Sequence, residues 1–595
     1  MASYFLRRLA MAIPVMFFVA LFVFLLLRLT PGDPAQAIAG DQATPAQLAA
    51  IRENLGLDKP LAGQFATWLA DMAGGDFGHS LISQRPVLEM IGQRVGPTLA
   101  LAVMAMIFTV VISLPLGVLA AWRHGGMVDR FVMALSVVGF SVPIFVIGYV
   151  LIAVFAVDLK WFPVQGYKPL AEGLGPFLHR ILLPGLALSS FYVALVSRMT
   201  RASMLEVLRE DYVRTARAKG LGERIVLFRH ALRNAAIPIL TVIGTGFAMM
   251  VSGVVVTETV FNIPGLGPRL SADPDDHPAD GRHLCADQPA DRPFLCAERP
   301  EDPLPMSASS NPVQGGLPRR RLLKNPPHWT TVLAVLVLLA IVAMAVFAPL
   351  LANFEPTKLN AAMRLKPSSN IYWLGTDSFG RDLYSRVVYG ARVSLLVGAG
   401  VAAGAILIGL PLGLIAGWYR AIDGVLMRMM DGLMAIPGIL LAIAIVALVR
   451  GGLLTVIIAI MIPAIPQVVR LVRARVIAAR EETYVDAAML LGTPPAKLIW
   501  KHLLPTTIAP LIVQGTYMYA SAILTEAALS FLGVGIGTEI PSWGNIMAEG
   551  RLYFAINHWL VFWPAIVLSA CILSINLLGD ALRDRLDPKM QGRAP

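Results

Sequence analysis

Two short stretches of this 595-residue chain carry residue types suited to close docking, and both follow one pattern. Each copy holds a tyrosine, a valine, an alanine, a glycine, a histidine and a proline, and every position recurs 272 residues later. The positions are Tyr212, Val213, Ala216, Gly220, His230 and Pro238, then Tyr484, Val485, Ala488, Gly492, His502 and Pro510. Constant spacing over six positions indicates an internal duplication, so we expect two matched surfaces.

Small residues are what this spacing brings together. Val213, Ala216 and Gly220 stand three and four positions apart, as do their copies, so in a helix they share one face. We expect that face to let another surface approach closely, and we expect Gly220 and Gly492 to end each helix and turn the chain. The alternative is a short helix that packs only on its own bundle. Docking, rather than bond chemistry, is the predicted role.

Motifs for catalysis are absent from the sequence. It contains no Gly-x-x-x-x-Gly-Lys-Ser/Thr loop for nucleotide phosphates, no His-Glu-x-x-His and no Gly-x-Ser-x-Gly. We expect packing or hydrogen-bonding roles for His230 and His502. The three cysteines, at positions 285, 296 and 571, lack metal-ligand spacing. The prediction is a protein that is not an enzyme and holds no metal or cofactor of its own.

Composition predicts that the chain is a membrane protein. The chain is 56% hydrophobic and 15% charged, with a mean hydropathy of +0.67, which is typical of an all-α polytopic membrane protein surrounded by lipid. The net charge is +11, but the basic residues cluster in short loops beside apolar segments. That pattern is the positive-inside rule of membrane proteins, and we expect no nucleic-acid partner.

Eleven apolar segments are candidates for membrane spans, each of which needs about 20 residues. The first half has five: Leu9–Leu29, Thr98–Ala121, Val132–Val157, Ile181–Val196 and Ile237–Val260. The second half has six: Thr330–Leu351, Leu395–Trp418, Met427–Val449, Leu453–Val469, Ile508–Phe531 and Val561–Leu582. The first segment also resembles a secretion signal, but its length favours a retained helix.

Basic residues predict the orientation of the two halves. Residues 198–233 hold nine Lys and Arg against four Asp and Glu, and residues 470–501 hold six against three, so both repeated loops should face the cytoplasm. The run Arg319-Arg320-Arg321 places the start of the second half inside as well. Five spans cannot connect two inside positions, so one crossing is missing between Val260 and Thr330.

A polar segment occupies the place of that crossing. Residues 268–305 hold eight prolines and no long apolar run, so they can neither span a membrane nor pack a core. Our hypothesis is that a reading-frame lesion replaced a sixth span and that residues 306–595 are normally a separate chain; the alternative is a genuine linker. The expected organisation is a first half at 1–267, a junction at 268–329 and a second half at 330–595.

Further shared positions fall inside the apolar segments. Asp129 precedes Pro143 by the same 14 residues that separate Asp423 from Pro437. The two prolines are either packing kinks or pore residues. Glu258 and Glu526 follow a threonine near the outer ends of the fifth span of each half, where either a gate or a helix-end contact is expected. Two parallel repeats would place a substrate path between the halves.

Several ordered motifs support a family resemblance. Residues 1–267 include Leu29-Thr-Pro-Gly-Asp-Pro34, Leu55-Gly-Leu-Asp-Lys-Pro60 and Phe261-Asn-Ile-Pro-Gly-Leu-Gly267. Residues 306–595 include Leu374-Gly-Thr-Asp-Ser-Phe-Gly-Arg-Asp382, Tyr389-Gly-Ala-Arg-Val-Ser394, Ser530-Phe-Leu-Gly533, Trp543-Gly-Asn545 and Asn576-Leu-Leu-Gly-Asp580. With the repeated loops, these motifs resemble the first and second permease subunits of dipeptide, oligopeptide and nickel ABC importers, here joined in one chain.

The resemblance implies a fold, partners and a location. It implies a type I importer permease in the bacterial inner membrane, in which each repeated loop is a coupling helix that sits in a groove of an ATPase subunit. ATP would be bound by two such partner subunits. A periplasmic binding protein would dock on residues 31–95, which include the capping box Thr44-Pro-Ala-Gln47, and on Glu539–Trp559.

The implied activity is import of dipeptides or oligopeptides. Import of nickel or another small solute by the same branch is the alternative substrate assignment. In the first copy Arg214 and Arg217 stand where the second has Asp486 and Met489, so the two loops need not grip their ATPases alike. An ion-coupled secondary transporter, of another class, would need charged groups near the membrane midplane, and the segments hold few.

Overall fold

The computed structural model describes residues 2–29, 52, 57–79, 85–267, 329–449 and 452–586. Within these residues the regular structure is helical and no strand is formed, so the all-α prediction is confirmed. Eight helices are long and apolar enough to cross a membrane, and two further bent pairs pass the same test. The predicted junction, 268–329, and the predicted capping box lie almost entirely outside the described residues.

The first half is built around three long helices. Its helices are α1 (Ala2–Leu29), α4 (Leu61–Ala73), α5 (Val87–Trp122), α6 (Met127–Ser141), α7 (Ile144–Leu151), α8 (Leu174–Val207), α9 (Asp211–Ala218), α10 (Glu223–Ile225) and α11 (Leu232–Phe261). A π-helical stretch, Ile152–Asp158, continues α7. Prolines lie inside α5, α8 and α11, where helix neighbours compensate for the lost backbone donors.

The second half follows the same order. Its helices are α12 (Trp329–Val346), α13 (Ala348–Leu351), α14 (Leu383–Trp418), α15 (Arg420–Ala435), α16 (Gly438–Val449), α17 (Leu453–Arg480), α18 (Thr483–Leu490), α19 (Pro495–Leu498), α20 (Leu504–Phe531), α21 (Trp543–Arg551) and α22 (Trp559–Leu586). Helices α5, α8, α9 and α11 therefore correspond to α14, α17, α18 and α20.

Two predicted spans are each broken into two arms. We expected continuous helices over Val132–Val157 and Met427–Val449, but α6 meets the arm Ile144–Asp158 at 107° and α15 meets α16 at 85°. Pro143 caps the start of α7, and Pro437 lies between α15 and α16. The residue before a proline is driven out of the helical region, and Val142 is extended, with ψ 124°. Bends of this size exceed a packing kink.

Glycines let the central helices cross closely in both halves. A Cβ added to Gly117 of α5 would lie 2.5 Å from Thr200 Cβ in α8. At the matching position, a Cβ added to Gly413 of α14 would lie 2.6 Å from Val472 Cβ in α17. Any larger residue would collide with a β-branched neighbour, so the crossing requires glycine.

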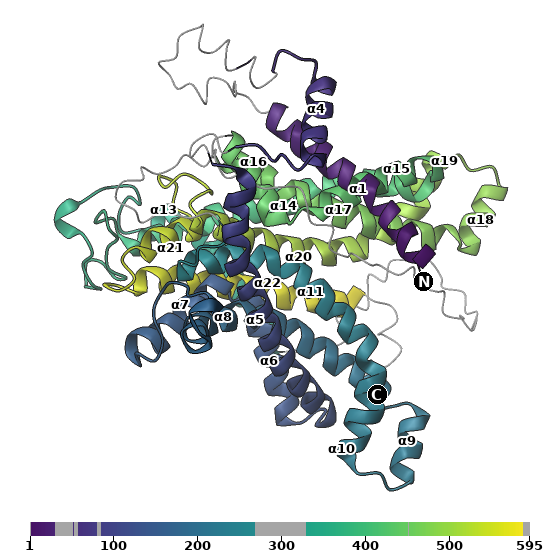
Figure 1. The fold of residues 1–595 in the computed structure, drawn as a ribbon, viewed down its shortest axis with the longest axis horizontal. Helices are drawn as coiled ribbons and strands as arrows, with labels where there is room; N and C mark the ends of the chain where they lie inside the picture. Colours follow the sequence, from purple (N-terminus) through teal and green to yellow (C-terminus); the bar gives the residue numbers. More distant parts are fainter. Residues whose placement is uncertain are drawn as a thin grey trace.

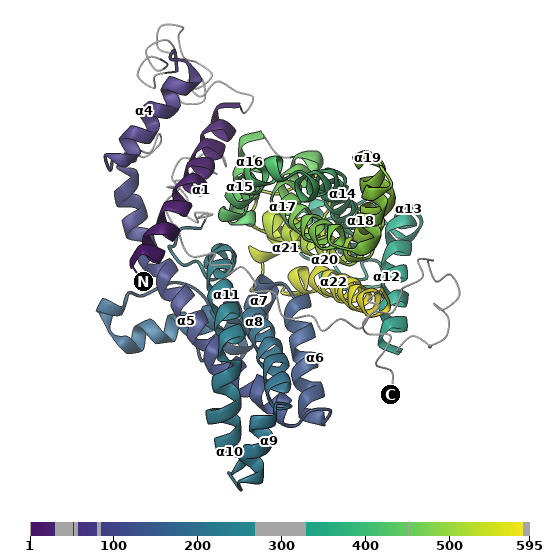
Figure 2. The same ribbon diagram turned by 90° about the vertical axis from the view of Figure 1, so that its right-hand side faces the viewer.

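The halves join through their bent helices. Helix α6 packs against α22 of the second half, and α15 packs against α1 of the first. Figures 1 and 2 place α9 and α18 far apart, at the ends of two separate groups of helices. We call the side of the molecule that carries α9 and α18 the inner end, because the basic loops lie there, and the opposite side the outer end.

Candidate functional site

The inner loops have the same local geometry in both halves. Helices α9 and α18 are followed by Gly220 and Gly492, with φ of 76° and 74°. The amide of Leu221 donates to the carbonyl of Ala216, and the amide of Thr493 donates to that of Ala488. This pattern ends a helix at a left-handed glycine, as the sequence predicted.

The face that carries the small residues points inward, contrary to our expectation. Val213 and Val485 are fully buried, and Ala216 and Ala488 are also buried. Val213 packs with Val226 of the same loop. A side chain that is already covered by its own chain cannot form the docking surface. A four-residue spacing defines one face of a helix but does not say which neighbour covers it.

The opposite faces of α9 and α18 are exposed, and they differ. Tyr212 and Tyr484, at matching positions, are 41% and 43% exposed. Beyond them, α18 ends in an apolar tip, Leu490 and Leu491, with exposures of 89% and 85%. The matching residues at the end of α9 are Ala218, its last residue, and Lys219, and Arg214 on α9 has a side-chain exposure of 75%. The exposed surface of the first loop carries arginines and a lysine, and that of the second is apolar.

The two histidines lie in π-helical turns after the loops. His230 belongs to the stretch Val226–Ala231 and His502 to Ile499–Leu503. Pro238 and Pro510 follow inside α11 and α20. The Tyr484 and His502 rings lie 6.2 Å apart, whereas the Tyr212 hydroxyl accepts from Asn234 at 2.9 Å. Partial burial, with a contribution from Glu482, raises the pKa of Tyr484, so this phenol stays neutral at cellular pH.

A second duplicated element is an ion pair at the inner end. The Arg201 guanidinium on α8 donates to both carboxylate oxygens of Asp129 on α6, at 2.5 and 2.8 Å. Arg473 on α17 likewise donates to both oxygens of Asp423 on α15, one of them at 2.7 Å. Arg473 lies 272 residues after Arg201, in register with the repeated loops. The sequence drew attention to both aspartates but not to their arginine partners.

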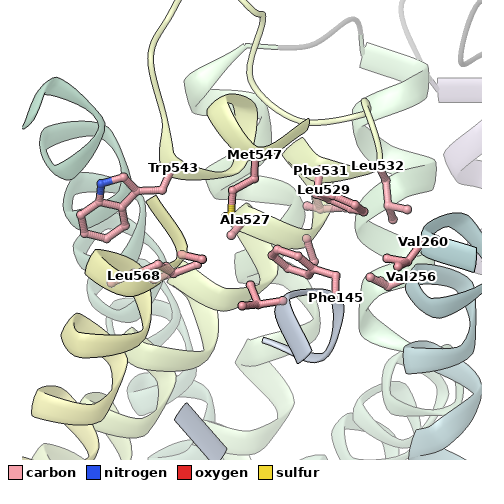
Figure 3. Packing of buried hydrophobic residues seen from close by; sticks show 14 of the residues in the cluster. Phe145, Val256, Val260, Ala527, Leu529, Phe531, Leu532, Trp543, Met547 and Leu568 are labelled. Carbon is pink, nitrogen blue, oxygen red and sulfur yellow. The ribbon is translucent and has the colours of Figure 1, made fainter. Parts of the chain in front are cut away.

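Aromatic rings join the two halves at the outer end. Phe145 of α7 stacks on Phe531, the last residue of α20, with ring centroids 4.6 Å apart and an interplanar angle of 12°. The Tyr149 ring, one turn along α7, has its centroid 4.6 Å from that of the Phe554 ring. Figure 3 shows Phe145 facing Phe531 within the buried apolar cluster, with Val256 and Val260 of α11 beside them. We call this contact the outer aromatic contact.

Pro143 acts on this contact through the backbone. It is buried at the break and starts the arm that carries Phe145 two residues later. Pro437 starts the matching arm but is only partly buried. Sequence reasoning selected the prolines and missed the phenylalanine, because aromatic residues in an apolar segment give no signal of which ones meet.

Glu258 and Glu526 are buried hydrogen-bond acceptors between helices. They are 2% and 0% exposed. The Thr98 hydroxyl on α5 donates to Glu258 at 2.5 Å, and the Ser394 hydroxyl on α14 donates to Glu526 at 3.1 Å. Glu258 also accepts from the amide of Gly267 at 2.7 Å. This geometry supports a helix-end contact, the second of the two roles expected from the sequence.

A buried charge network fastens the outer segment of the second half to α21. The Arg381 Nε donates to Asp377 at 2.6 Å, and Arg386 donates to Asp377 and, at 2.6 Å, to Glu549. Arg381 also pairs with Glu549. Arg386 is 1% exposed. Nearby, burial lowers the pKa of the Arg551 guanidinium, which donates to the carbonyl of Phe531 at 3.2 Å.

Comparisons with known proteins agree with the duplicated architecture. The model of the binding-protein-dependent transport system inner membrane component matches the chain twice, over residues 113–272 and 409–592. The model of the N-terminal region of such membrane components matches residues 1–102. Metal-binding clusters of three or more His, Cys, Asp or Glu do not occur among the residues that the structure describes.

Relatives match one half at a time. A protein of Sinorhizobium fredii, named as a probable peptide ABC transporter permease, is 54% identical over 46% of this chain and 87% of its own length. A second such protein of the same strain is 46% identical over 42% of this chain and 86% of its own length. A protein of Brucella abortus biovar 1, named as a putative peptide transport system permease protein, is 45% identical over 46% of this chain and 92% of its own length.

Less than half of this chain therefore aligns with most of the length of each relative. The duplicated loops, the multi-pass helical bundle and the two family matches describe one kind of molecule. Membership of the family places the protein in the inner membrane, excludes an enzymatic role and implies partnership with ATPase and substrate-binding subunits. The chain belongs to the family of binding-protein-dependent transport system inner membrane components, the ABC transporter permeases, with two permease units in one polypeptide.

Proposed function

We propose that the chain imports short peptides from the periplasm, driven by two ATPase subunits that dock on α9 and α18. The observation that carries the proposal is the pair of inner loops, in which α9 and α18 each end at a left-handed glycine and each expose one face to solvent. The peptide assignment is supported by the names of the relatives, at 45–54% identity. ATP is bound by the partners, because the chain has no phosphate-binding loop.

Alternating access is the mechanism that this architecture supports. The halves meet at the outer aromatic contact, and the inner loops lie apart (Figures 1 and 2). Docked ATPases that close would draw the loops together and release the outer end. To shift such an equilibrium from 1:99 to 99:1, the ATPases must favour one state by about 5.5 kcal/mol.

The exposed faces favour unlike grooves on the two ATPases. The basic face of α9 fits a groove lined with carboxylates, and the apolar tip of α18 fits an apolar one. Both arginines of α9 have acidic neighbours, Arg217 with Glu223 at 2.9 Å and Arg214 with Asp211 at 3.1 Å, but Arg214 is the more exposed, at 75% against 41%. A binding protein that delivers the peptide would dock at the outer end, where α21 and residues 354–382 lie.

Two alternatives remain as outcomes of an experiment. A nickel or small-solute permease of the same branch would share the whole fold, and its substrate would be selected by the binding protein. An ion-coupled transporter would need free carboxylates near the midplane, whereas Glu258 and Glu526 lie near the outer ends of α11 and α20 and accept hydrogen bonds from hydroxyl donors.

The test is reconstitution of the chain in vesicles with its ATPases and binding protein. We expect ATP-dependent uptake of labelled di- to oligopeptides. Uptake of nickel but of no peptide would contradict the substrate assignment. Uptake that continues without ATP and follows a proton gradient would contradict the transporter class.

The coupling role of the loops is tested with a backbone change. Gly492→Pro should abolish peptide-stimulated ATP hydrolysis and leave membrane insertion intact, because φ 74° is inaccessible to proline. Gly220→Pro should do the same in the first loop. Normal yield of bound ATPases together with normal stimulation in both variants would refute the coupling role.

We also propose that residues 306–595 form a separate polypeptide in functional systems. Support comes from relatives that match one half each. Translation of the neighbouring frames across residues 269–305 should recover roughly 20 apolar residues followed by a basic tail. Polar or interrupted sequence in every frame would show that the junction is a genuine linker.

A further inference from the structure

The Asp129–Arg201 and Asp423–Arg473 pairs connect the loop-bearing helices to the bent helices. Arg201 lies six residues before the end of α8, and α9 starts four residues after that end. Asp129 lies in the first turn of α6. The pair therefore joins the helix that leads into the inner loop to the helix that leads toward the outer end. The second half repeats this arrangement with α17 and α15.

Their geometry is directional. Two parallel N–H donors meet two carboxylate oxygens in each pair, which sets the orientation as well as the distance between the helices. The Asp129 side chain is only 5% exposed and also accepts from the amide of Gly125 at 2.9 Å and contacts His124 at 3.1 Å. A carboxylate with this many partners does not change partners freely.

The helix beside each arginine is already clamped. Thr200, adjacent to Arg201, meets Gly117 of α5, and Val472, adjacent to Arg473, meets Gly413 of α14. The helices α5 and α8, or α14 and α17, thus form one close-packed unit. The ion pair is the duplicated polar tie from this unit to the bent helix, beside a Ser136–Ser197 contact in the first half and the Arg470–Asp431 pair in the second. Movement of the unit can therefore be passed to α6 or α15.

The far end of α6 reaches the outer aromatic contact. Its 15 residues span about 22 Å as a helix, from the ion pair to the break at Pro143. Beyond the break, Phe145 stacks on Phe531 of the other half. A rotation of α6 at its inner end therefore moves the arm that carries Phe145.

We propose that the two Asp–Arg pairs are positioning pairs that transmit movement of the inner loops through the bent helices to the outer aromatic contact. The Asp129–Arg201 pair acts through α6 and the arm that carries Phe145, and the Asp423–Arg473 pair acts through α15 and α16, which packs on α20, the helix that ends at Phe531. This inference rests on the proposed function, since the ATPases supply the movement. A pair that only stabilised the bundle would affect folding without affecting how the outer contact responds to ATP. The pairs are expected to control that response.

The readout is a cross-link across the outer aromatic contact. The native cysteines are first removed by Cys285→Ser, Cys296→Ser and Cys571→Ala. Phe145→Cys and Phe531→Cys then place one cysteine on each side of the contact, and a short bismaleimide cross-links them. The full chain is assembled with its ATPases. We expect a high cross-link yield without nucleotide and a yield at least threefold lower with ATP and vanadate.

In this background, Arg201→Met should remove the ATP effect on the cross-link while the ATPases remain bound and hydrolyse ATP. Peptide uptake per ATP hydrolysed, measured in the chain with native Phe145 and Phe531, should fall at least tenfold. Arg201→Lys keeps the positive charge but loses the two parallel N–H donors of the guanidinium, so its peptide uptake per ATP hydrolysed should fall about threefold. If Arg201→Met does not assemble, the double variant Asp129→Arg with Arg201→Asp restores an opposite-charge pair and should recover part of the ATP effect.

The second half offers a matched control on the same two helices. Arg470 on α17 pairs with Asp431 on α15 at 2.6 Å, and its side chains, 30% and 32% exposed, resemble those of Arg473 and Asp423, at 30% and 23%. This pair is not duplicated, because the match of Arg470 in the first half, Arg198, lies over the Phe140 ring. Asp423→Asn should remove the ATP effect, and Asp431→Asn should leave uptake per ATP within twofold of the unchanged chain.

Each outcome decides between explanations. An unchanged ATP effect in both Arg201→Met and Asp423→Asn, or equal losses in Asp423→Asn and Asp431→Asn, would overturn the proposal. If ATP does not change the cross-link yield in the two-cysteine chain that keeps both Asp–Arg pairs, the proposal is overturned as well. A normal cross-link response without peptide uptake would support the pairs' role and refute only the peptide assignment, because the cross-link needs no substrate.

Discussion

The two halves share their inner ends and differ at their outer ends. Both halves have the loop helix with its left-handed glycine and the bidentate ion pair. At the outer end the first half packs α4 on α1 through rings, among them Phe24, Phe65 and Trp68, 5.2–6.1 Å apart. The second half instead uses the buried charge network around Arg386.

This difference shows which parts of the duplicated unit are constrained alike. Under the proposed function both inner ends meet ATPase subunits, which would explain why the backbone geometry there is repeated even though the surface chemistry is not. The outer segments each need only to be held on their own bundle, and ring packing or buried charges can do this. The energetic consequences differ, because ring contacts weaken gradually whereas a broken buried pair leaves a charge uncompensated.

The largest expected effect is on the outer network. Arg386→Met leaves Asp377 and Glu549 short of a partner, and removal of one member of a buried pair costs about 3–5 kcal/mol. Phe65→Ala in the first half should cost less, about 1–3 kcal/mol, since this ring is only partly buried. Thermal unfolding in detergent measures both. Equal losses would erase the distinction between the two outer ends.

The close helix crossings should respond equally in the two halves. Gly117→Ala and Gly413→Ala place a methyl group 2.5–2.6 Å from a neighbouring Cβ, and such overpacking costs about 1–3 kcal/mol. Gly424→Ala in α15, which has open space at its Cβ position, is the control and should not destabilise the chain. A loss confined to one half would show that the two crossings are not equivalent, as would a loss in the control.

The glycines after the loop helices should show a smaller effect, again in both halves. Gly220→Ala and Gly492→Ala force a left-handed residue with a Cβ, at a cost of about 1 kcal/mol, and should reduce ATPase co-purification by a few fold. Gly222→Ala, with φ −61° in the same loop, should retain full binding. Equal binding by all three variants would indicate that the turn geometry does not matter.

Changes at the apolar tip of α18 should have the smallest effect on the free energy of unfolding. They should lower binding of the ATPase subunit that docks there. Leu490→Lys changes a side chain that is 89% exposed, so the free energy of unfolding should move by less than about 0.5 kcal/mol. Co-purification of one ATPase should fall. Arg214→Leu on α9 should instead affect the ATPase bound to the first loop. Loss of both ATPases from either variant would show that the loops do not dock independently.

Local patterns in the sequence predicted most of the bundle. Ten of the eleven predicted spans fall in helices or bent pairs that are long and apolar enough to cross a membrane, because the bilayer requires backbone groups to be paired within the segment. The exception is Leu9–Leu29, which is helical, but its apolar stretch Ile13–Leu26 is shorter than a span. The breaks at Pro143 and Pro437 were not predicted, although both prolines were noted. An apolar run has the same composition whether it is straight or bent by 107°, so length and hydropathy could not reveal the two arms.

The sequence alone determined the duplication, the membrane class and the glycine turns, because these depend on composition and on residues close together in the chain. Tertiary structure decided that Val213 and Val485 face inward, that Asp129 binds Arg201, and that Phe145 meets Phe531. Those contacts join residues 72 or more positions apart or depend on which neighbour covers a helix face. Helical periodicity places residues on a face, and only the packing of the other helices determines what that face touches.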